Sequence, residues 1–204
     1  MENESLKSSL KLNPTDTASE ADLGRRVREI RKARGWTLKD LAERSGLAVS
    51  TISKMERGEI SLTYDRFMRL AQGLGMDVGE LFDAGAEGFT RGSVSITRAG
   101  DGPIHRSDTY DYQMIAGDLA GKHMVPMIGH IKANSFAAFE DFISHPGEEF
   151  IHVLRGEVTV HLKGRDPVVL YPGDNLYFDS GLGHAYVSTG DIEAVLLGVC
   201  WKPG

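Results

Sequence analysis

The spacing of hydrophobic residues changes once along the chain, near residue 90. Before that point apolar side chains recur every three or four positions, as at Leu23, Val27 and Ile30, which is the period of a helix with one buried face. Beyond residue 93, apolar and polar residues alternate in short segments separated by Gly, Pro and Asp, which predicts strands joined by turns. The pattern therefore predicts a two-domain α + β protein.

Five short helices are expected over residues 19–83. Five of the boundaries rest on capping residues and terminating glycines, namely Ser19 with Asp22, Gly35, Thr37 with Asp40, Gly46 and Gly58. The last two helices rest on apolar spacing alone, around Phe67 to Leu74 and around Val78 to Phe82. Arg31 and the other basic residues of the first helix are expected on its solvent-facing sides.

The second and third of these helices are joined by a tight turn at Gly46. That arrangement is how a protein presents a rigid helix to the major groove of DNA. On the third helix Ser50, Ser53, Lys54 and Arg57 recur at helical spacing and form one polar stripe. Binding of double-stranded DNA is the function that this stripe indicates. For any single arginine, a solvated helix face remains open as the alternative.

Residues 23–82 closely resemble the lambda-repressor-like helix-turn-helix family, also called the xenobiotic-response-element family. The matching positions are Leu23-Gly24, Arg28, Arg31, Gly35-Trp36-Thr37-Leu38, Leu41-Ala42, Gly46-Leu47, Ile52-Ser53, Glu56-Arg57-Gly58, Leu74-Gly75 and Leu81-Phe82. The resemblance implies a homodimer on a near-palindromic site, with base contacts from the start of the third helix and phosphate contacts around it. The residues expected at DNA are Arg25, Arg28, Thr37, Val49, Ser50, Ser53, Lys54 and Arg57.

Charge and histidine content differ between the two halves. The net charge is −6 overall, yet residues 21–60 hold ten Lys/Arg against six Asp/Glu, and residues 91–204 hold nine against fourteen. All seven histidines lie between His105 and His184. A basic N-terminal part and an acidic, histidine-bearing C-terminal part indicate two separate roles.

The domain organisation expected from these patterns has four parts. They are a disordered tail over 1–18, the DNA-binding domain over 19–83, a Gly/Ala-rich linker over 84–96 and an all-β domain over 97–204. Strands are expected at Val94–Thr97, Tyr110–Met114, Phe150–Leu154 and Val158–Leu162, in an antiparallel barrel or sandwich. No signal peptide or membrane-crossing segment is expected, and the single Cys200 fits a cytoplasmic protein without disulfides, as a small apolar residue on a late strand.

Residues 97–199 resemble the cupin family, a double-stranded β-helix barrel. The first motif is His145-Pro-Gly-Glu-Glu149 through Gly156, and the second runs from Gly173 to His184. In metal-binding cupins two histidines and a glutamate of the first motif and one histidine of the second bind one ion. Ile143 stands here in place of the first histidine and Ser188 in place of an asparagine of the second motif.

The resemblance leaves His145, Glu149 and His184 as three candidate ligands for one divalent metal. Such a set suits Fe(II) or an open zinc site; the alternative is that these groups bind an organic effector without metal. Positions 143, 145, 149, 151 and 153 share parity and are expected to face the lumen, whereas His152 faces away. The expected effector pocket comprises Tyr110, Tyr112, Ile143, His145, Glu149, Ile151, Val153 and His184, with core packing as the alternative for the tyrosines.

Together these features predict a cytoplasmic DNA-binding regulator, not an enzyme, whose cupin barrel senses a small molecule. The chain also resembles the iron-dependent epoxidase of fosfomycin biosynthesis, which joins the same two modules and uses His, Glu and His ligands. An iron-dependent cupin oxygenase is therefore the alternative function. A third reading is an antitoxin-like DNA-binding protein whose barrel only dimerises.

Overall fold

The computed structural model describes residues 20–76, 81 and 87–201, which divide into two compact units. One unit is mainly helical and contains the described residues up to Ser95 together with Gly117–Lys122. The other contains the strands of residues 96–116 and 123–201. The tail expected over residues 1–18 and the predicted capping residue Ser19 lie outside the described residues. Among the described helices there is no candidate for a membrane span.

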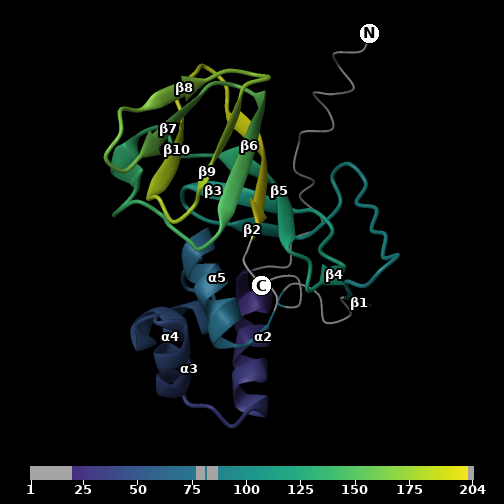
Figure 1. The fold of residues 1–204 in the computed structure, drawn as a ribbon. Helices are drawn as coiled ribbons and strands as arrows, with labels where there is room; N and C mark the ends of the chain where they lie inside the picture. The colour runs from purple at the N-terminus through teal and green to yellow at the C-terminus, as the bar shows by residue number, and fades with distance from the viewer. Residues whose placement is uncertain (1–19, 77–80, 82–86, 202–204) are drawn as a thin grey trace. The chain divides into compact units, whose positions relative to one another are not determined.

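Four helices are described in the helical unit (Figure 1), namely α2 (Glu20–Ala33), α3 (Leu38–Ser45), α4 (Val49–Glu56) and α5 (Tyr64–Gly73). The prediction of a five-helix bundle is corrected to four helices in this part of the chain. Most of the fifth helix, expected around Val78 to Phe82, lies outside the described residues, although Leu81 itself is helical and buried. The helices enclose a core that includes Leu41, Ile52, Phe67 and Leu70.

The backbones of α2 and α4 approach each other closely at Gly24. A Cβ atom at this position would lie 2.3 Å from the carbonyl oxygen of Met55 on α4. No side chain larger than hydrogen fits there without moving one of the helices. A similar contact joins α3 and α5, because a Cβ atom at Gly73 would lie 2.7 Å from Cβ of Ser45. Two glycines thus set how closely these helix pairs pack.

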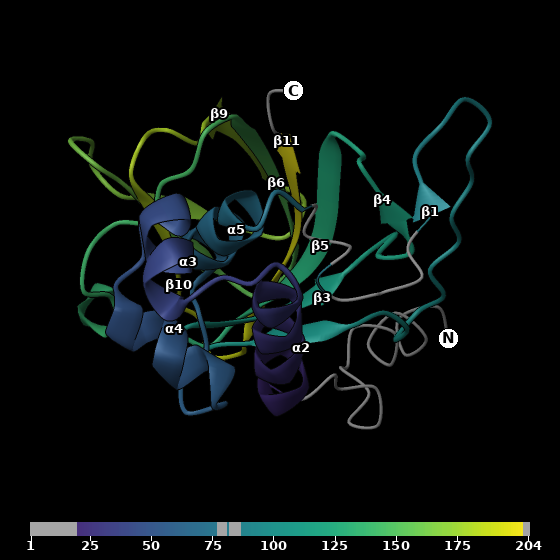
Figure 2. The same ribbon diagram turned by 90° about the horizontal axis from the view of Figure 1, so that it is seen from below.

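A short parallel pair, β1 (Glu87–Gly88) and β4 (Leu119–Ala120), completes the helical unit (Figure 2). It falls partly within the segment expected to be a linker. The strand expected at Val94–Thr97 does not form, and this prediction is wrong. Val94 and Ile96 are 79% and 69% exposed, and within the described residues no strand pairs with them, so alternation alone did not produce a strand.

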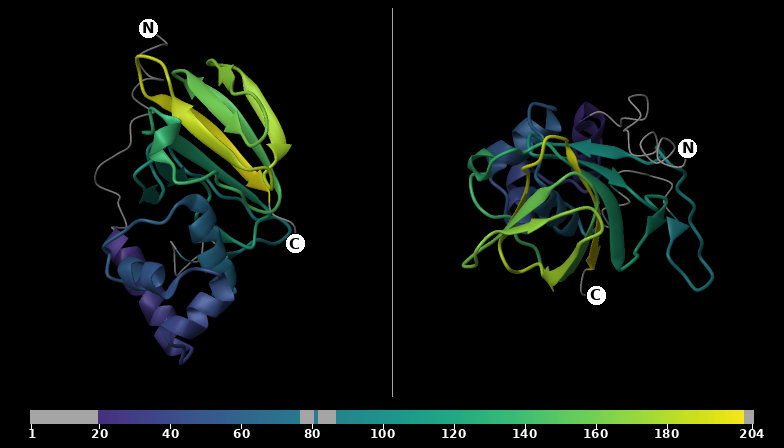
Figure 3. Two further views of the ribbon diagram at one scale, coloured as in Figure 1. Left: turned by 90° about the vertical axis from the view of Figure 1, so that its left-hand side faces the viewer. Right: turned by 90° about the horizontal axis from the view of Figure 1, so that it is seen from above.

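The second unit consists of two antiparallel sheets (Figure 3). The larger sheet has the order β2 (Ile104–Arg106), β3 (Tyr110–Met114), β5 (Met124–Ile131), β11 (Ala194–Trp201), β6 (Glu148–Arg155) and β9 (Asn175–Asp179). The smaller has the order β10 (His184–Ser188), β7 (Val158–Leu162) and β8 (Val168–Leu170), and a short 3-10 helix, η1 (Phe136–Ala138), precedes β6. The strands predicted at Tyr110–Met114 and Val158–Leu162 are confirmed as β3 and β7, and the one predicted at Phe150–Leu154 lies within β6.

Side chains from both sheets meet in one core. Ile151 and Val153 of β6 pack with Val158 and Val160 of β7 and with Leu196 of β11. Residues of β6 alternate between buried and partly exposed positions, as a strand with one covered face requires. The sheets therefore face each other across a closed interior, as the cupin resemblance implies.

Candidate functional site

Local chemistry sets both ends of α3, a capping box at its start and Gly46 at the turn that leads to α4. Thr37 Oγ1 accepts a hydrogen bond from the Asp40 backbone N–H at 3.2 Å, and Asp40 Oδ2 accepts one from the Thr37 N–H at 2.7 Å. This predicted capping box is confirmed. The hydrogen bonds from Thr37 hold the pKa of Asp40 below its usual value. Gly46 ends α3 with φ of 67°, a conformation that glycine adopts without strain.

A buried ion pair fixes α4 against α2. Arg31 Nε donates to Glu56 Oε1 at 2.6 Å and its Nη2 donates to Oε2 at 2.8 Å, while Nη1 donates to the carbonyl of Trp36 at 2.7 Å. The side chains are only 9% and 5% exposed. Arg31 was expected on a solvent-facing side of its helix, and that prediction is wrong because Glu56, 25 residues away in sequence, covers it. The hydrogen bonds that Arg31 donates to Glu56 raise the pKa of Arg31.

The residues predicted to contact bases, Val49, Ser50 and Ser53, lie on the outward side of α4 with Lys54, a predicted phosphate contact. Val49 is 44% exposed, Ser50 and Lys54 are exposed, and Ser53 is half-buried. Ile52 and Met55, on the opposite side, are buried at 0% and 3%. The alternation at helical spacing leaves one face of α4 for packing and one face without cover within the helical unit.

Three of the predicted phosphate contacts, together with Arg57 of the polar stripe, lie on the surface of the helical unit. Arg25 and Arg28 of α2, Thr37 before α3 and Arg57 after α4 are all exposed. Exposed cations next to an outward helix match the electrostatic footprint of a DNA-binding surface. We call Arg25, Arg28, Thr37, Val49, Ser50, Ser53, Lys54 and Arg57 the recognition surface.

Arg57 has an acidic partner that the sequence did not reveal. Its Nε and Nη2 donate to the two carboxylate oxygens of Glu59 at 2.6 and 2.7 Å. Its Nη1 also donates to Ser53 Oγ. These hydrogen bonds raise the pKa of Arg57 and lower that of Glu59. Arg57 must therefore exchange a carboxylate for a phosphate if it is to contact DNA.

In the β unit, a second cluster of polar groups is centred on the carboxylate of Glu149. His145 Nε2 lies 3.1 Å from Glu149 Oε2, and His184 Nε2 lies 3.4 Å from the same oxygen. The Tyr186 hydroxyl donates a hydrogen bond to Glu149 Oε1 at 2.7 Å. All four residues are at most 8% exposed. Burial raises the pKa of Glu149, but the hydrogen bond from His145 and the charge of His184 outweigh it, so the net shift is downward.

The tautomer of His184 makes this cluster suited to a cation. Its Nδ1 lies 2.9 Å from the carbonyl oxygen of Leu182 and must donate, because a carbonyl only accepts. In the neutral ring, Nε2 then directs a lone pair toward Glu149 Oε2, which is also an acceptor. The two acceptors, His184 Nε2 and Glu149 Oε2, repel each other unless a proton or a metal ion lies between them. Fixing of Nδ1 by a backbone carbonyl is also the usual arrangement behind a metal-ligating histidine.

Cys200 joins the cluster from the neighbouring strand. Its Sγ and one ligand atom each of His145 and Glu149 all lie within 4.8 Å of one another, and among the described residues these three form the candidate metal-binding group. Sequence reasoning treated Cys200 only as a small apolar residue and did not identify Tyr186. Neither residue belongs to the two cupin motifs. Cys200 lies next to Glu149 because β11 pairs with β6, and Tyr186 reaches Glu149 from β10.

The predicted pocket residues that surround the cluster are mostly apolar and buried. Ile143, Ile151 and Val153 belong to the core, as does Tyr110, and Tyr112 packs against it. The Tyr110 hydroxyl accepts a hydrogen bond from the Tyr186 N–H at 2.8 Å, and burial raises the pKa of Tyr110. His152, which was expected to face away, lies 2.7 Å from the Asn175 side chain on the other side of β6.

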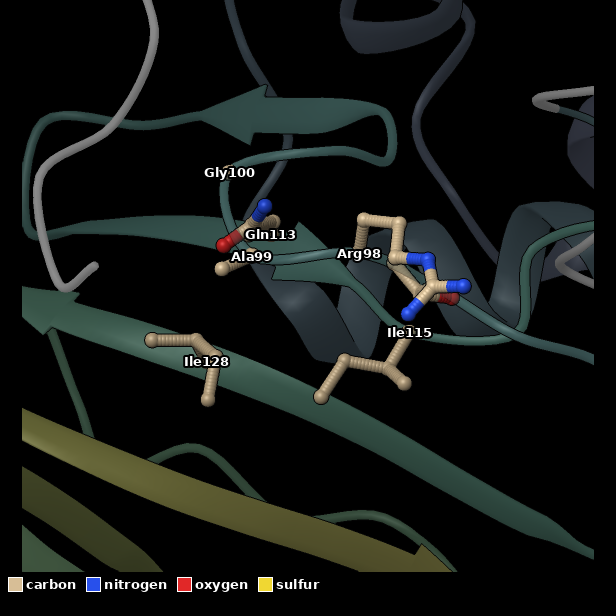
Figure 4. Close-up of a pocket in the computed structure, with 7 residues that line it drawn as sticks. Arg98, Ala99, Gly100, Gln113, Ile115 and Ile128 are labelled. Atoms are coloured by element: carbon tan, nitrogen blue, oxygen red, sulfur yellow. The ribbon is translucent and has the colours of Figure 1, made fainter.

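A hollow of about 200 Å³ lies elsewhere on the β unit (Figure 4). It is lined by Thr97, Arg98, Ala99, Gly100, Gln113, Ile115 and Ile128. Gln113 and Ile128 are paired across β3 and β5, and alternation along β3 turns Gln113 away from the interior that Tyr112 faces. The hollow is therefore on the outer side of the large sheet, and none of the predicted pocket residues lines it.

Known proteins resemble both units. Residues 27–81 match the helix-turn-helix family model, and residues 137–200 match that of the cupin domain. The HTH-type transcriptional regulator PuuR of Escherichia coli (strain K12) is 26% identical over 166 residues, covering 81% of this chain and 87% of that protein. The same regulator of Shigella flexneri gives the same values.

Two solved structures match most of the chain, and the first of them shares its fold. An HTH_3 family transcriptional regulator from Vibrio cholerae superposes with a TM-score of 0.60 at 20% identity, over 93% of this chain and all of that one. Hydroxypropylphosphonic acid epoxidase from S. wedmorenis gives 0.47 at 23% identity, over 92% of this chain and all of that one. The chain thus joins a helix-turn-helix domain to a cupin domain and is related to helix-turn-helix transcriptional regulators.

Proposed function

We propose that this protein is a transcriptional regulator that binds double-stranded DNA through the recognition surface and senses a small molecule in its cupin barrel. The observation that carries the proposal is the division of α4 into two faces. Its inner face is fixed by Gly24 and by the Arg31–Glu56 pair, and its outer face presents Val49, Ser50 and Lys54. A rigid helix with an uncovered polar face is what major-groove recognition requires.

Roles within the recognition surface follow from side-chain chemistry. Val49 is suited to a thymine methyl group, and the hydroxyls of Ser50 and Ser53 can exchange hydrogen bonds with base edges. Lys54, Arg25 and Arg28 are suited to phosphates, which fix the position of the protein without reading sequence. A homodimer would place two copies of α4 in successive major grooves of a near-palindromic site.

In the β unit, we propose that the effector binds among the predicted pocket residues around Glu149. One divalent transition metal, zinc or iron, fits the donor set of His145, Glu149 and His184. Such an ion would supply a Lewis acid that anchors an oxygen of the effector. The apolar walls of Ile143, Ile151 and Val153 would exclude water and select ligands by shape.

Charge reversal at Lys54 tests the DNA-binding role. Lys54→Glu should weaken binding to operator DNA at least about tenfold and reduce the slope of log affinity against log salt by about one. The matched control is Lys163→Glu, an exposed lysine in the β unit. Binding is measured by fluorescence anisotropy over a salt series, with thermal melts to verify that both variants remain folded.

Two outcomes would contradict the proposal. Equal losses in the two lysine variants would mean that only net charge matters. Absence of DNA affinity in the unmodified protein, together with oxygen consumption when Fe(II) and a substrate are supplied, would favour the oxygenase alternative. That alternative rests on the His–Glu–His donor set, which a sensor and a ferrous enzyme share.

A further inference from the structure

Strand pairing directs Cys200 into the barrel. On β11, Leu196 belongs to the core and Cys200 is buried at 6%, whereas the intervening Leu197 and Val199 are half-buried. Cys200 is the register partner of Glu149 on β6. Side chains on directly opposed residues of an antiparallel pair lie on the same face and next to each other. The thiol is therefore held beside the carboxylate by backbone geometry.

The ligand atoms of this group are near the separations found in a metal site. Zinc–ligand bonds are about 2.0–2.3 Å, so two ligand atoms around one tetrahedral ion are about 3.3–3.8 Å apart. The ligand atoms of His145, Glu149 and Cys200 lie within 4.8 Å of one another, so side-chain adjustments of up to about 1.5 Å would enclose a tetrahedral ion. The three atoms are nitrogen, oxygen and sulfur, each of which zinc accepts.

The hydrogen bond from Tyr186 to Glu149 also favours metal binding. Tyr186 donates to Glu149 Oε1 and leaves Oε2 toward the histidines. A hydrogen bond that occupies one oxygen of a carboxylate and orients the other is the usual support of a metal-ligating group. Ile143 stands at the position where the cupin motif has its first histidine, and Cys200 offers a third or fourth ligand from another strand.

We propose that the Cys200 thiolate is a metal ligand in this barrel, together with His145 and Glu149. The site then differs from the His145–Glu149–His184 set by one soft sulfur ligand, which favours zinc over hard cations such as Mg²⁺. This inference rests on the metal-binding part of the proposed function and is independent of DNA binding. His184 Nε2 lies 3.4 Å from Glu149 Oε2 but does not belong to the group whose ligand atoms all lie within 4.8 Å of one another.

Cobalt(II) provides the probe, because it occupies zinc sites and gives an intense near-ultraviolet band when bound to thiolate. The chain contains one cysteine, so a thiolate-to-cobalt band in the unmodified, metal-depleted protein assigns the ligand without any variant. We expect this band to saturate at about one equivalent of cobalt. Zinc should abolish it by displacement.

Cys200→Ser should lose the band and bind zinc at least about tenfold more weakly in a chelator competition. His152→Asn is the matched control, since His152 lies on β6 but contacts Asn175 on the opposite side; its band and affinity should equal those of the unmodified protein. Circular dichroism verifies the folding of both variants. If Cys200→Ser does not fold, the band in the unmodified protein decides alone.

Three results would overturn the proposal. One is cobalt binding without a thiolate band, which would assign the site to histidines and carboxylate only. Another is unchanged zinc affinity in a folded Cys200→Ser variant. The third is failure of the protein to bind cobalt or zinc at all. Loss of DNA binding in Lys54→Glu would leave each of these measurements unaffected, so the two proposals fail separately.

Discussion

Two ion pairs of nearly identical geometry lie at adjacent positions at the end of α4. Arg31 and Glu56 form one two-pronged pair with distances of 2.6 and 2.8 Å, and Arg57 and Glu59 form the other with 2.6 and 2.7 Å. The first pair is 9% and 5% exposed, and the second is 49% and 50% exposed. Burial, rather than geometry, distinguishes them.

The comparison shows why sequence neighbours have different roles. Breaking the buried pair leaves a charge that water cannot reach, so it acts as a structural restraint. The exposed pair exchanges readily with water and ions, since its charges are already solvated. Arg57 can therefore change partners, as the proposed contact with DNA requires, and Arg31 cannot.

The largest effect is expected from Arg31→Met. This change leaves the Glu56 carboxylate buried without its cation and removes the hydrogen bond to Trp36, which should lower the free energy of unfolding by about 3 kcal/mol. The double variant Arg31→Met, Glu56→Leu should recover more than half of that loss, because no unpaired charge remains. Urea denaturation measures both, and equal stability of the two variants would mean that the pair is not effectively buried.

A smaller effect of a different kind is expected from Glu59→Gln. The change frees Arg57 and removes a negative charge near the phosphates, so DNA affinity should rise roughly two- to fivefold, with little change in melting temperature. The matched control is Glu43→Gln, which removes an exposed carboxylate of α3 that pairs with Lys39 at 3.8 Å. Equal gains in both variants would show that Arg57 has no specific part in the effect.

The smallest effect concerns pH. The hydrogen bonds from Arg57 hold the pKa of Glu59 below 4.5 in the folded protein. Its stabilising contribution is therefore present above pH 4.5 and is lost as the pH falls through the folded pKa. The small difference in melting temperature between the unmodified protein and Glu59→Gln should disappear in acid. The Thr37–Asp40 capping box is present in both proteins, so its contribution cancels. A difference that grows on acidification would contradict the assignment.

Local features of the fold could be predicted from the sequence because their causes are local. The Thr37–Asp40 capping box and the Gly46 turn depend on residues within one turn of each other. The strand at Val158–Leu162 was predicted with its observed bounds, since its alternation is regular and it has a partner on each side, β10 and β8. Val94–Thr97 alternates as well, but without a partner strand its backbone hydrogen bonds are not satisfied in a sheet.

The unpredicted parts of both candidate sites depend on contacts between distant residues. Burial of Arg31 requires Glu56 to lie across from it, and helix periodicity of α2 alone gives no sign of that. Cys200 and Tyr186 reach Glu149 through the register of β11 and the position of β10. The spacing of the two cupin motifs identified His145, Glu149 and His184 because these residues lie at motif positions. The pairing register of the strands, by contrast, is fixed only when the sheets assemble.

The close helix contact at Gly24 affects which residues of α4 can change without loss of stability. Because the axis of α4 is set by main-chain contact with α2, the outward side chains of α4 have little part in holding the helix in place. Their identities can vary while the scaffold stays intact. If these side chains read DNA as proposed, single substitutions among them should change the preferred operator while leaving stability nearly unchanged.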